Sequence, residues 1–328
     1  MGRPRRGAPR LSALPAALAT FLARAGWGDA LAAPLAGDAS ARRYWRLRRP
    51  DGASAILMSG PAEPDEVPAF LEVGRHLAAR GVAVPAVLAA APADRLVLLE
   101  DWGPELLDAR LAREPALEET AYALAGRLLG RLAAEPAPAF LPPYDLAWYL
   151  QEIAIFLDWS LPDAPKAPLL GAWEAALTPL LATPPRFVHR DFHAQNLFWL
   201  DDRPGIQRLG VIDFQGARAG HPAYDLVSLV EDARRDVGPA ARLAALAGFR
   251  EAAPDAHDEA ALTAAMAVLG AQRHTKILGL FDRLARRDGK PQYRAMKPRV
   301  RAHLERCLAH EALAELRAWH DRFGFGEA

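Results

Sequence analysis

Two short motifs in the middle of the chain carry side chains that could transfer a phosphate group. The first is H-R-D-x-x-x-x-N, which begins at His189, and the second is I-D-F around Asp213. Asp191 can accept the proton of a hydroxyl, and Asn196 and Asp213 offer oxygen atoms of the kind that Mg²⁺ prefers. Together these groups are the minimum for moving the terminal phosphate of ATP onto a hydroxyl.

The segment between Asn196 and Asp213 has the pattern of a β-hairpin. An apolar run at 197–200 and a second predicted strand at 207–212 flank a turn sequence, D-D-R-P-G. Antiparallel pairing brings the start of one strand beside the end of the other, so Asn196 and Asp213 are expected to lie close together. The alternative is that these are ordinary polar loop residues with no part in catalysis. The predicted hairpin favours the catalytic interpretation, because it explains the spacing between the two motifs.

The other polar residues of the first motif are expected either to support the loop or to contact the substrate. His189 and Arg190 are predicted to hold the loop in shape through hydrogen bonds. His193 and Gln195 are candidates for contacts with the substrate, with packing as the alternative for each.

The order of elements predicts an α+β fold of the protein-kinase-like, two-lobe type. Predicted strands at 44–47, 53–58 and 95–100 alternate with helices at 11–25 and 67–79, and a turn is predicted at 34–40. The rest is mainly helical, with helices at 118–132 and 145–157, a proline-rich loop at 135–143 and long helices after the hairpin. The expected domains are a small β-rich N-lobe at 1–100, a hinge at 101–103 and a larger C-lobe at 104–328.

The nucleotide is expected to lie against the N-lobe. Gly37, Asp38, Ala39 and Ser40 stand where a phosphate-covering loop should be, since glycine and small neighbours let backbone N–H groups approach phosphate oxygens. A plain turn is the alternative. At the hinge, backbone groups of Glu100 and Trp102 would face adenine.

The N-lobe lacks the lysine that kinases usually direct at the α- and β-phosphates. Met58 stands at that position, and Glu72 on the next helix has no obvious partner. Arg42 or Arg43 is hypothesised to supply the positive charge, because a guanidinium group suits phosphate geometry. The alternative for these arginines is a solvated strand edge.

Several motifs along nearly the whole chain carry a resemblance to a known family. They lie at 36–40, 42–44, 188–196, 212–215, 223–229, 270–274 and 287–291. By these motifs the chain resembles the aminoglycoside-phosphotransferase-like kinases, which are small-molecule relatives of protein kinases. Within that family it is most similar to the anomeric sugar kinases of bacterial cell-wall recycling.

The resemblance implies roles for individual residues. Asp191 would be the catalytic base, Asn196 and Asp213 the Mg²⁺ ligands, and Asp225 a structural brace of the loop at the start of a helix. ATP and Mg²⁺ would be the cofactors. The implied reaction is phosphorylation of N-acetylmuramate or N-acetylglucosamine, or both, at the anomeric hydroxyl.

The acceptor sugar is expected beside the segment that follows Tyr144. Asp145 and Glu152 could accept hydroxyl protons while neighbouring aromatic rings cover the sugar, although the rings could equally belong to the core. The basic segment 270–301 has a solvated face as its default interpretation. The sharper interpretation is that Arg273 or Lys290 meets the lactyl carboxylate of N-acetylmuramate.

Two other functions stay open on the sequence alone. One is phosphorylation of an aminoglycoside, choline or a related amine by the same fold, although such cations need an acidic pocket. The other is a nucleotide-binding pseudokinase that regulates a partner. Met58 favours the pseudokinase, while the intact Asp191, Asn196 and Asp213 argue against it.

Composition limits the class of protein. The 328 residues include 40 basic and 40 acidic side chains, which argues against a general nucleic-acid binder. The single cysteine, Cys307, allows no intramolecular disulfide. The arginine-rich start could be a secretory signal, but a basic tail before a helix is favoured, and no apolar run suits a membrane span. We therefore expect a cytoplasmic enzyme, plausibly monomeric, with a small sugar substrate.

Overall fold

The computed structural model of the protein describes residues 15–35, 42–62, 65–253 and 258–326. The chain divides into two compact units. The first comprises residues 1–105 and 210–216, and the second comprises residues 106–209 and 217–328. The H-R-D motif therefore belongs to the second unit, whereas the I-D-F motif returns to the first.

The first unit contains a five-stranded antiparallel sheet with the strand order β1-β2-β3-β5-β4. The strands are β1 (Leu31–Leu35), β2 (Arg43–Arg48), β3 (Ser54–Ser59), β4 (Val87–Ala91) and β5 (Leu96–Glu100). The predicted strands correspond to β2, β3 and β5. β1 replaces the start of the predicted turn, because Pro34 pairs with Trp45 on an edge strand, where a missing N–H is tolerated.

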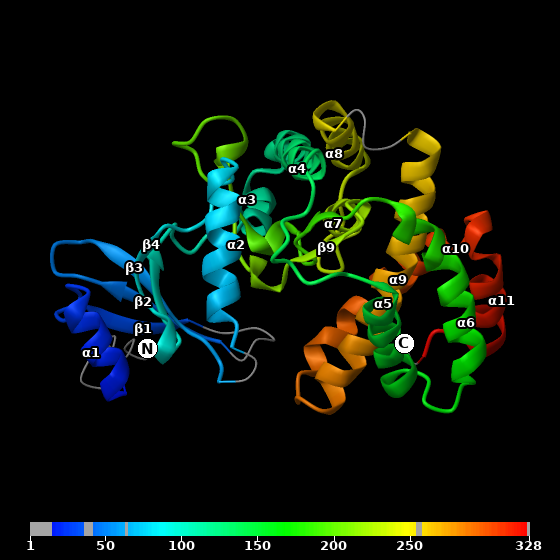
Figure 1. The fold of residues 1–328 in the computed structure, drawn as a ribbon, viewed down its shortest axis with the longest axis horizontal. Coiled ribbons are helices and arrows are strands. Elements are labelled where there is room, and N and C mark those ends of the chain that lie inside the picture. The colour runs from blue at the N-terminus through cyan, green and yellow to red at the C-terminus, as the bar shows by residue number, and fades with distance from the viewer. Residues whose placement is uncertain (1–14, 36–41, 63–64, 254–257, 327–328) are drawn as a thin grey trace, which may run out of the picture. The chain divides into compact units, whose positions relative to one another are not determined.

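Two long helices complete the first unit. α1 (Ala16–Arg24) lies beside the sheet (Figure 1), and its Phe21 and Leu22 belong to one core cluster with the sheet residues. The part of the predicted helix before residue 15 lies outside the described residues. α2 (Val67–Ala79) has the predicted bounds. Phe70 of α2 stacks on Phe214 at 4.9 Å between ring centroids, which fixes the I-D-F segment against this helix.

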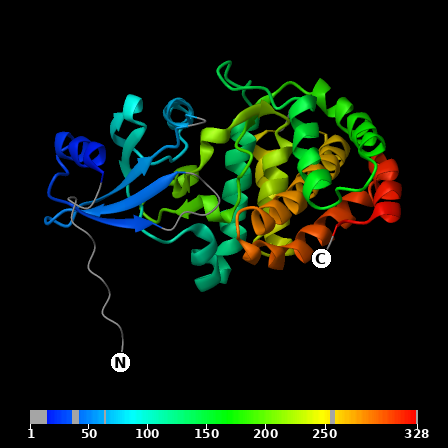
Figure 2. The ribbon, with the colours of Figure 1, turned by 90° about the horizontal axis from the view of Figure 1, so that it is seen from below.

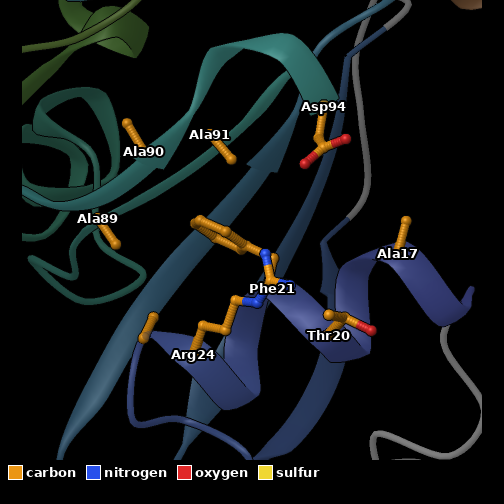
Figure 3. Close-up of a pocket in the computed structure, with 9 residues that line it drawn as sticks. Ala17, Thr20, Phe21, Arg24, Ala89, Ala90, Ala91 and Asp94 are labelled. Atoms are coloured by element: carbon orange, nitrogen blue, oxygen red, sulfur yellow. The ribbon is translucent and has the colours of Figure 1, made fainter.

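A cavity of about 450 Å³ lies between α1 and β4 (Figure 3). Phe21 and Arg24 reach toward the small side chains of Ala89, Ala90 and Ala91. Among the residues that line this cavity, only Arg24 and Asp94 are ionisable. None of the predicted site residues lines it, so it plays no part in the proposed chemistry.

Helices make up most of the second unit (Figure 2). The longer helices are α3 (Leu107–Arg113), α4 (Glu118–Ala133), α5 (Leu146–Trp159), α6 (Lys166–Leu177), α7 (Ala223–Val230), α8 (Pro239–Ala252), α9 (Glu259–Arg286), α10 (Lys297–Leu308) and α11 (Ala314–Phe323). β6 (Arg186–Val188) pairs with β9 (Arg218–Gly220), and the predicted hairpin is present as β7 (Leu197–Trp199) with β8 (Leu209–Val211). Across the described residues, no helix combines the length and apolar character that a bilayer crossing requires.

Small residues allow α4 and α8 to pack closely (Figure 1). A Cβ on Gly126 would collide with the carbonyl oxygen of Ala245, and a Cβ on Gly130 would collide with that of Phe249. Gly248 on α8 meets the α4 backbone in the same way. The two backbones can approach this closely only because these positions carry no side chain.

We predict that Gly126→Ala lowers the free energy of unfolding by about 1–3 kcal/mol or more, because the added methyl group must force two helices apart. Gly171→Ala on α6 is the matched control, since a Cβ there meets nothing within 4 Å. That control should raise stability by up to about 1 kcal/mol, through higher helix propensity. Urea denaturation measures the free energy of unfolding of both variants. If Gly126→Ala were as stable as Gly171→Ala, the packing argument would be contradicted.

Candidate active site

The loop that carries Asp191 is held by the buried carboxylate of Asp225. This carboxylate accepts hydrogen bonds from the backbone N–H groups of His189, at 2.6 Å, and Arg190, at 2.8 Å. Arg190 has a φ of 78°, a backbone conformation that side chains other than glycine rarely adopt. Burial raises the pKa of Asp225 to about 6. The placement agrees with the predicted bracing role of Asp225 and with loop support from His189 and Arg190.

The side chain of Arg190 ends on Glu152, where several donors converge. Glu152 accepts from Arg190 Nη2 at 2.8 Å and Lys276 Nζ at 2.9 Å. Further donors are Tyr144 Oη at 2.7 Å, Trp148 Nε1 at 3.2 Å and Gln272 Nε2 at 3.2 Å. Burial alone would raise the pKa of Glu152, but Lys276 and Arg190 lower it to about 2. The carboxylate is therefore a buried anion that joins α5, the loop and α9.

The two carboxylates predicted to contact sugar have other partners. Glu152 is 5% exposed and its oxygens are already used, so the geometry favours a positioning role for it. Asp145 is exposed, and its Oδ1 accepts from Trp148 N at 2.9 Å as the N-cap of α5. Direct sugar contact by Asp145 stays a prediction.

Asp191 itself is open to solvent, as a group that meets a substrate must be. Nearby protein atoms desolvate its carboxylate, which would raise its pKa, but Lys276, Arg190 and Arg273 lower it well below the ordinary value. The carboxylate is therefore charged at neutral pH and is a weak base. Such a group orients a hydroxyl and receives its proton late in the transfer.

Asn196 and Asp213 each offer oxygen to a hard cation. Asn196 Nδ2 donates to the Asp191 carbonyl oxygen at 2.9 Å, so the amide oxygen of Asn196 is not used in this hydrogen bond. Asp213 has a φ of 65°, and its Oδ1 accepts from Arg42 at 2.6 Å and Gln215 at 3.0 Å. An amide oxygen and a carboxylate oxygen fit Mg²⁺. The closeness of Asn196 to Asp213 stays a prediction.

His193 is buried within the loop and has one nitrogen with no partner. Arg234 Nη1 lies 3.2 Å from Nε2 of His193, and because a guanidinium group can only donate, Nε2 must accept. The ring proton then sits on Nδ1, which has no hydrogen-bond partner in the described structure. Burial and Arg234 lower the pKa of His193 well below its ordinary value, so the ring is neutral. Gln195 beside it is half-buried.

The basic helix α9 does not have the solvated face that its composition suggested by default. Arg273 is 3% exposed, and Lys276 is largely enclosed, while Arg286 and Arg287 toward the helix end are exposed. Sequence reasoning missed the role of Lys276. The signal was the uninterrupted polar run at 272–276 in an otherwise apolar helix, because five consecutive residues cannot all face water.

Arg42 in the first unit bridges two carboxylates. Its Nε lies 3.2 Å from Glu66, and its Nη2 lies 2.6 Å from Asp213. Arg43, the other candidate cation, is exposed on β2. The sequence pointed to Glu72, which is exposed, and missed Glu66 at the start of α2. The predicted phosphate loop, at Gly37, Asp38, Ala39 and Ser40, lies outside the described residues.

The segment after β5, which was predicted to be a hinge, is held to β2 by an ion pair. Arg46 Nε lies 2.9 Å from Asp101 Oδ2, and Arg46 Nη2 donates to the Gly103 carbonyl oxygen at 2.7 Å. The N–H of Glu100 donates to the Ala86 carbonyl oxygen at 2.9 Å, so it is not available to adenine. Trp102 lies against Gly210, where a Cβ would collide with its ring. Adenine contact by other backbone groups of Glu100 and Trp102 stays a prediction.

Comparison with known proteins gives consistent matches along the chain. A model of the phosphotransferase enzyme family matches residues 32–262. An N-acetylmuramate/N-acetylglucosamine kinase from Caulobacter vibrioides is 37% identical over 354 aligned residues, covering 94% of this chain and 96% of the relative. A kinase of the same name from Pseudomonas aeruginosa is 32% identical over 311 residues, covering 89% of each.

Solved structures match the fold. A choline/ethanolamine kinase family protein from Mesorhizobium loti has a TM-score of 0.63 and 17% identity, covering 92% of this chain and 97% of the other. An amicoumacin kinase in complex with AMP-PNP and Ca²⁺ has a TM-score of 0.60 and 16% identity, and the match covers 84% of this chain and 87% of the other. These matches confirm the predicted α+β fold with a small β-rich part and a larger helical part.

We predict that Glu152→Gln destabilises the protein by about 3–5 kcal/mol at pH 7, because two buried cations lose their anion. The pKa of Glu152 is lowered from its ordinary value of 4.5 to about 2, so Glu152 stabilises the fold above pH 4.5 and loses this effect as the pH falls toward about 2. Urea unfolding between pH 7 and pH 3 should therefore show a flatter pH dependence in the variant. Glu174→Gln, on the exposed face of α6, is the control and should change neither quantity.

Proposed function

Because the chain belongs to the phosphotransferase enzyme family, we propose that it phosphorylates N-acetylmuramate or N-acetylglucosamine, or both, at the anomeric hydroxyl with ATP. The names of the relatives that match nearly the whole chain support this acceptor class. The observation that carries the proposal is the loop geometry: Asp191 is exposed and charged, directly after a strained Arg190 that Asp225 holds in place.

The proposed chemistry is mainly positioning. An anomeric hydroxyl is more acidic than an ordinary alcohol, so the weakly basic Asp191 suffices to orient it and collect its proton. Arg190 and Lys276, held by Glu152, keep Asp191 ionised. Mg²⁺, bound through Asn196 and Asp213, would neutralise charge on the transferred phosphate.

The charges around Asp191 argue against a cationic acceptor. Lys276, Arg190 and Arg273 all lie within electrostatic reach of the catalytic carboxylate. An aminoglycoside or choline would bring further positive charge to these three groups. A neutral or anionic sugar suits this environment better.

Arg42 is proposed to replace the missing kinase lysine. Its guanidinium is held between Glu66 and Asp213, much as a kinase lysine is held by a helix glutamate. The side chain is 9% exposed and its position is fixed by two ion pairs. It therefore offers a pre-oriented cation to the nucleotide phosphates without a lysine at Met58.

We predict that Arg42→Ala raises the KM for ATP by about 10- to 100-fold, since a charged hydrogen bond to phosphate is lost. Arg43→Ala removes an exposed guanidinium one residue away and should raise the same KM less than about threefold. Steady-state kinetics with varied ATP and calorimetric binding of ATP measure the effect. A larger effect at Arg43, or none at either position, would reject the assignment.

Removal of the catalytic groups tests the function itself. Asp191→Asn should lower kcat by about 10²- to 10⁴-fold, and Asp213→Ala should abolish measurable turnover, with the proteins still folded. Asp202→Asn, an exposed turn carboxylate in the same hairpin, is the control and should stay near wild type. ATP consumption with a panel of N-acetylated sugars, an aminoglycoside and choline identifies the acceptor. If no acceptor stimulates ATP consumption by the wild type, a pseudokinase becomes the better interpretation.

A further inference from the structure

Three N–H groups near Asp191 have no hydrogen-bond partner in the described part of the chain. They are Nδ1 of His193 and both Nε and Nη1 of Arg273. His193 belongs to the catalytic loop and Arg273 to α9, so two separate elements contribute these donors. Each side chain influences the titration of Asp191, and Arg273 also influences His193, which places all three residues within electrostatic reach of one another.

Burying these N–H groups without a hydrogen-bond acceptor has an unfavourable free energy. His193 is 4% exposed and Arg273 is 3% exposed, so neither is well solvated. A buried polar group without a partner loses its hydration and gains nothing in return, and a buried guanidinium loses most. Asp232 attracts Arg273 electrostatically but forms no hydrogen bond with its Nε or Nη1 atom. The arrangement is therefore built for an acceptor that arrives with the substrate.

The neighbouring cations are already engaged. Arg190 and Lys276 both bind Glu152, and Arg234 binds His193. Arg273 forms no ion pair with another described residue, although it lies in the same charged cluster. An incoming anion would thus find its counter-charge on Arg273, with the neutral His193 adding a further donor.

We propose that Arg273 and His193 form a receptor for a carboxylate on the acceptor sugar, which makes the enzyme prefer an acidic N-acetylated sugar to its neutral counterpart. The inference rests on the proposed function and adds the group that discriminates between its two sugars. N-acetylmuramate differs from N-acetylglucosamine by a lactyl ether that ends in a carboxylate. That ether is two ring carbons from the anomeric centre, so its carboxylate stays near a hydroxyl held by Asp191.

Planar donors on Arg273 suit a carboxylate better than a lysine would. A guanidinium group presents Nε–H and Nη–H in parallel, which matches the two oxygens of a carboxylate. A neutral sugar would leave these donors unfilled. A site built to hydrogen-bond a substrate group discriminates strongly against the analogue that lacks it.

The test compares three sugars within each enzyme preparation: N-acetylmuramate, its methyl ester and N-acetylglucosamine. The ester keeps the shape of the lactyl group but removes the charge. We expect the wild type to show a higher kcat/KM for the acid than for the ester. In Arg273→Gln, the acid-to-ester ratio should fall about 10- to 100-fold, and Arg273→Lys should give an intermediate ratio. Because each ratio comes from one preparation, partial misfolding does not affect it.

Further variants separate carboxylate binding by Arg273 from the alternative roles of this residue. Arg287→Gln removes an exposed guanidinium directly after α9 and should leave the ratio unchanged. An equal loss of kcat/KM for all three sugars in Arg273→Gln would overturn the proposal, because Arg273 would then act on the phosphate or on the fold. A change in ratio in Lys290→Gln but not in Arg273→Gln would also overturn it. If the wild type phosphorylates none of the three sugars, the proposed function itself fails.

Discussion

The buried carboxylate of Asp225 sets the conformation on which the rest of the site depends. It binds two consecutive backbone N–H groups, at His189 and Arg190, at the point where Arg190 adopts a positive φ. This unfavourable backbone angle is stable only because a charged acceptor compensates it. The angle in turn sends the Arg190 side chain toward Glu152 and leaves Asp191 facing solvent. One acid on α7 thus holds the backbone directly before Asp191.

Glu152 connects the loop that carries Arg190 to the helices α5 and α9. Two cations and three neutral donors meet on its two oxygens, so the helices and the loop share one buried anion. The same contacts hold Arg190 and Lys276 where they keep Asp191 ionised. Stability and chemistry are therefore coupled through a residue that does not itself need to touch the sugar.

The sequence predicted what local patterns encode and missed what tertiary contacts decide. The bounds of α2 and the hairpin at 197–211 followed from periodicity and turn residues. β4 is rich in alanine and forms a strand only because β5 pairs with it. The bracing of the loop at His189 and Arg190 by Asp225 was predicted from the family resemblance, and the structure places these three residues together. Arg190, Gln272 and Lys276, by contrast, approach Glu152 from elements far away in the sequence, and no spacing rule brings them to this carboxylate.

The first unit is assembled from two stretches of chain, and this has a consequence for its synthesis. Residues 210–216 emerge from the ribosome about a hundred residues after the last strand of the five-stranded sheet in the same unit. Until then, Arg42 lacks Asp213, and Phe70 on α2 lacks the ring of Phe214. A nascent chain that ends before residue 210 therefore contains every strand of the five-stranded sheet but lacks these partners of Arg42 and Phe70. The first unit can be completed only after the H-R-D loop has been made.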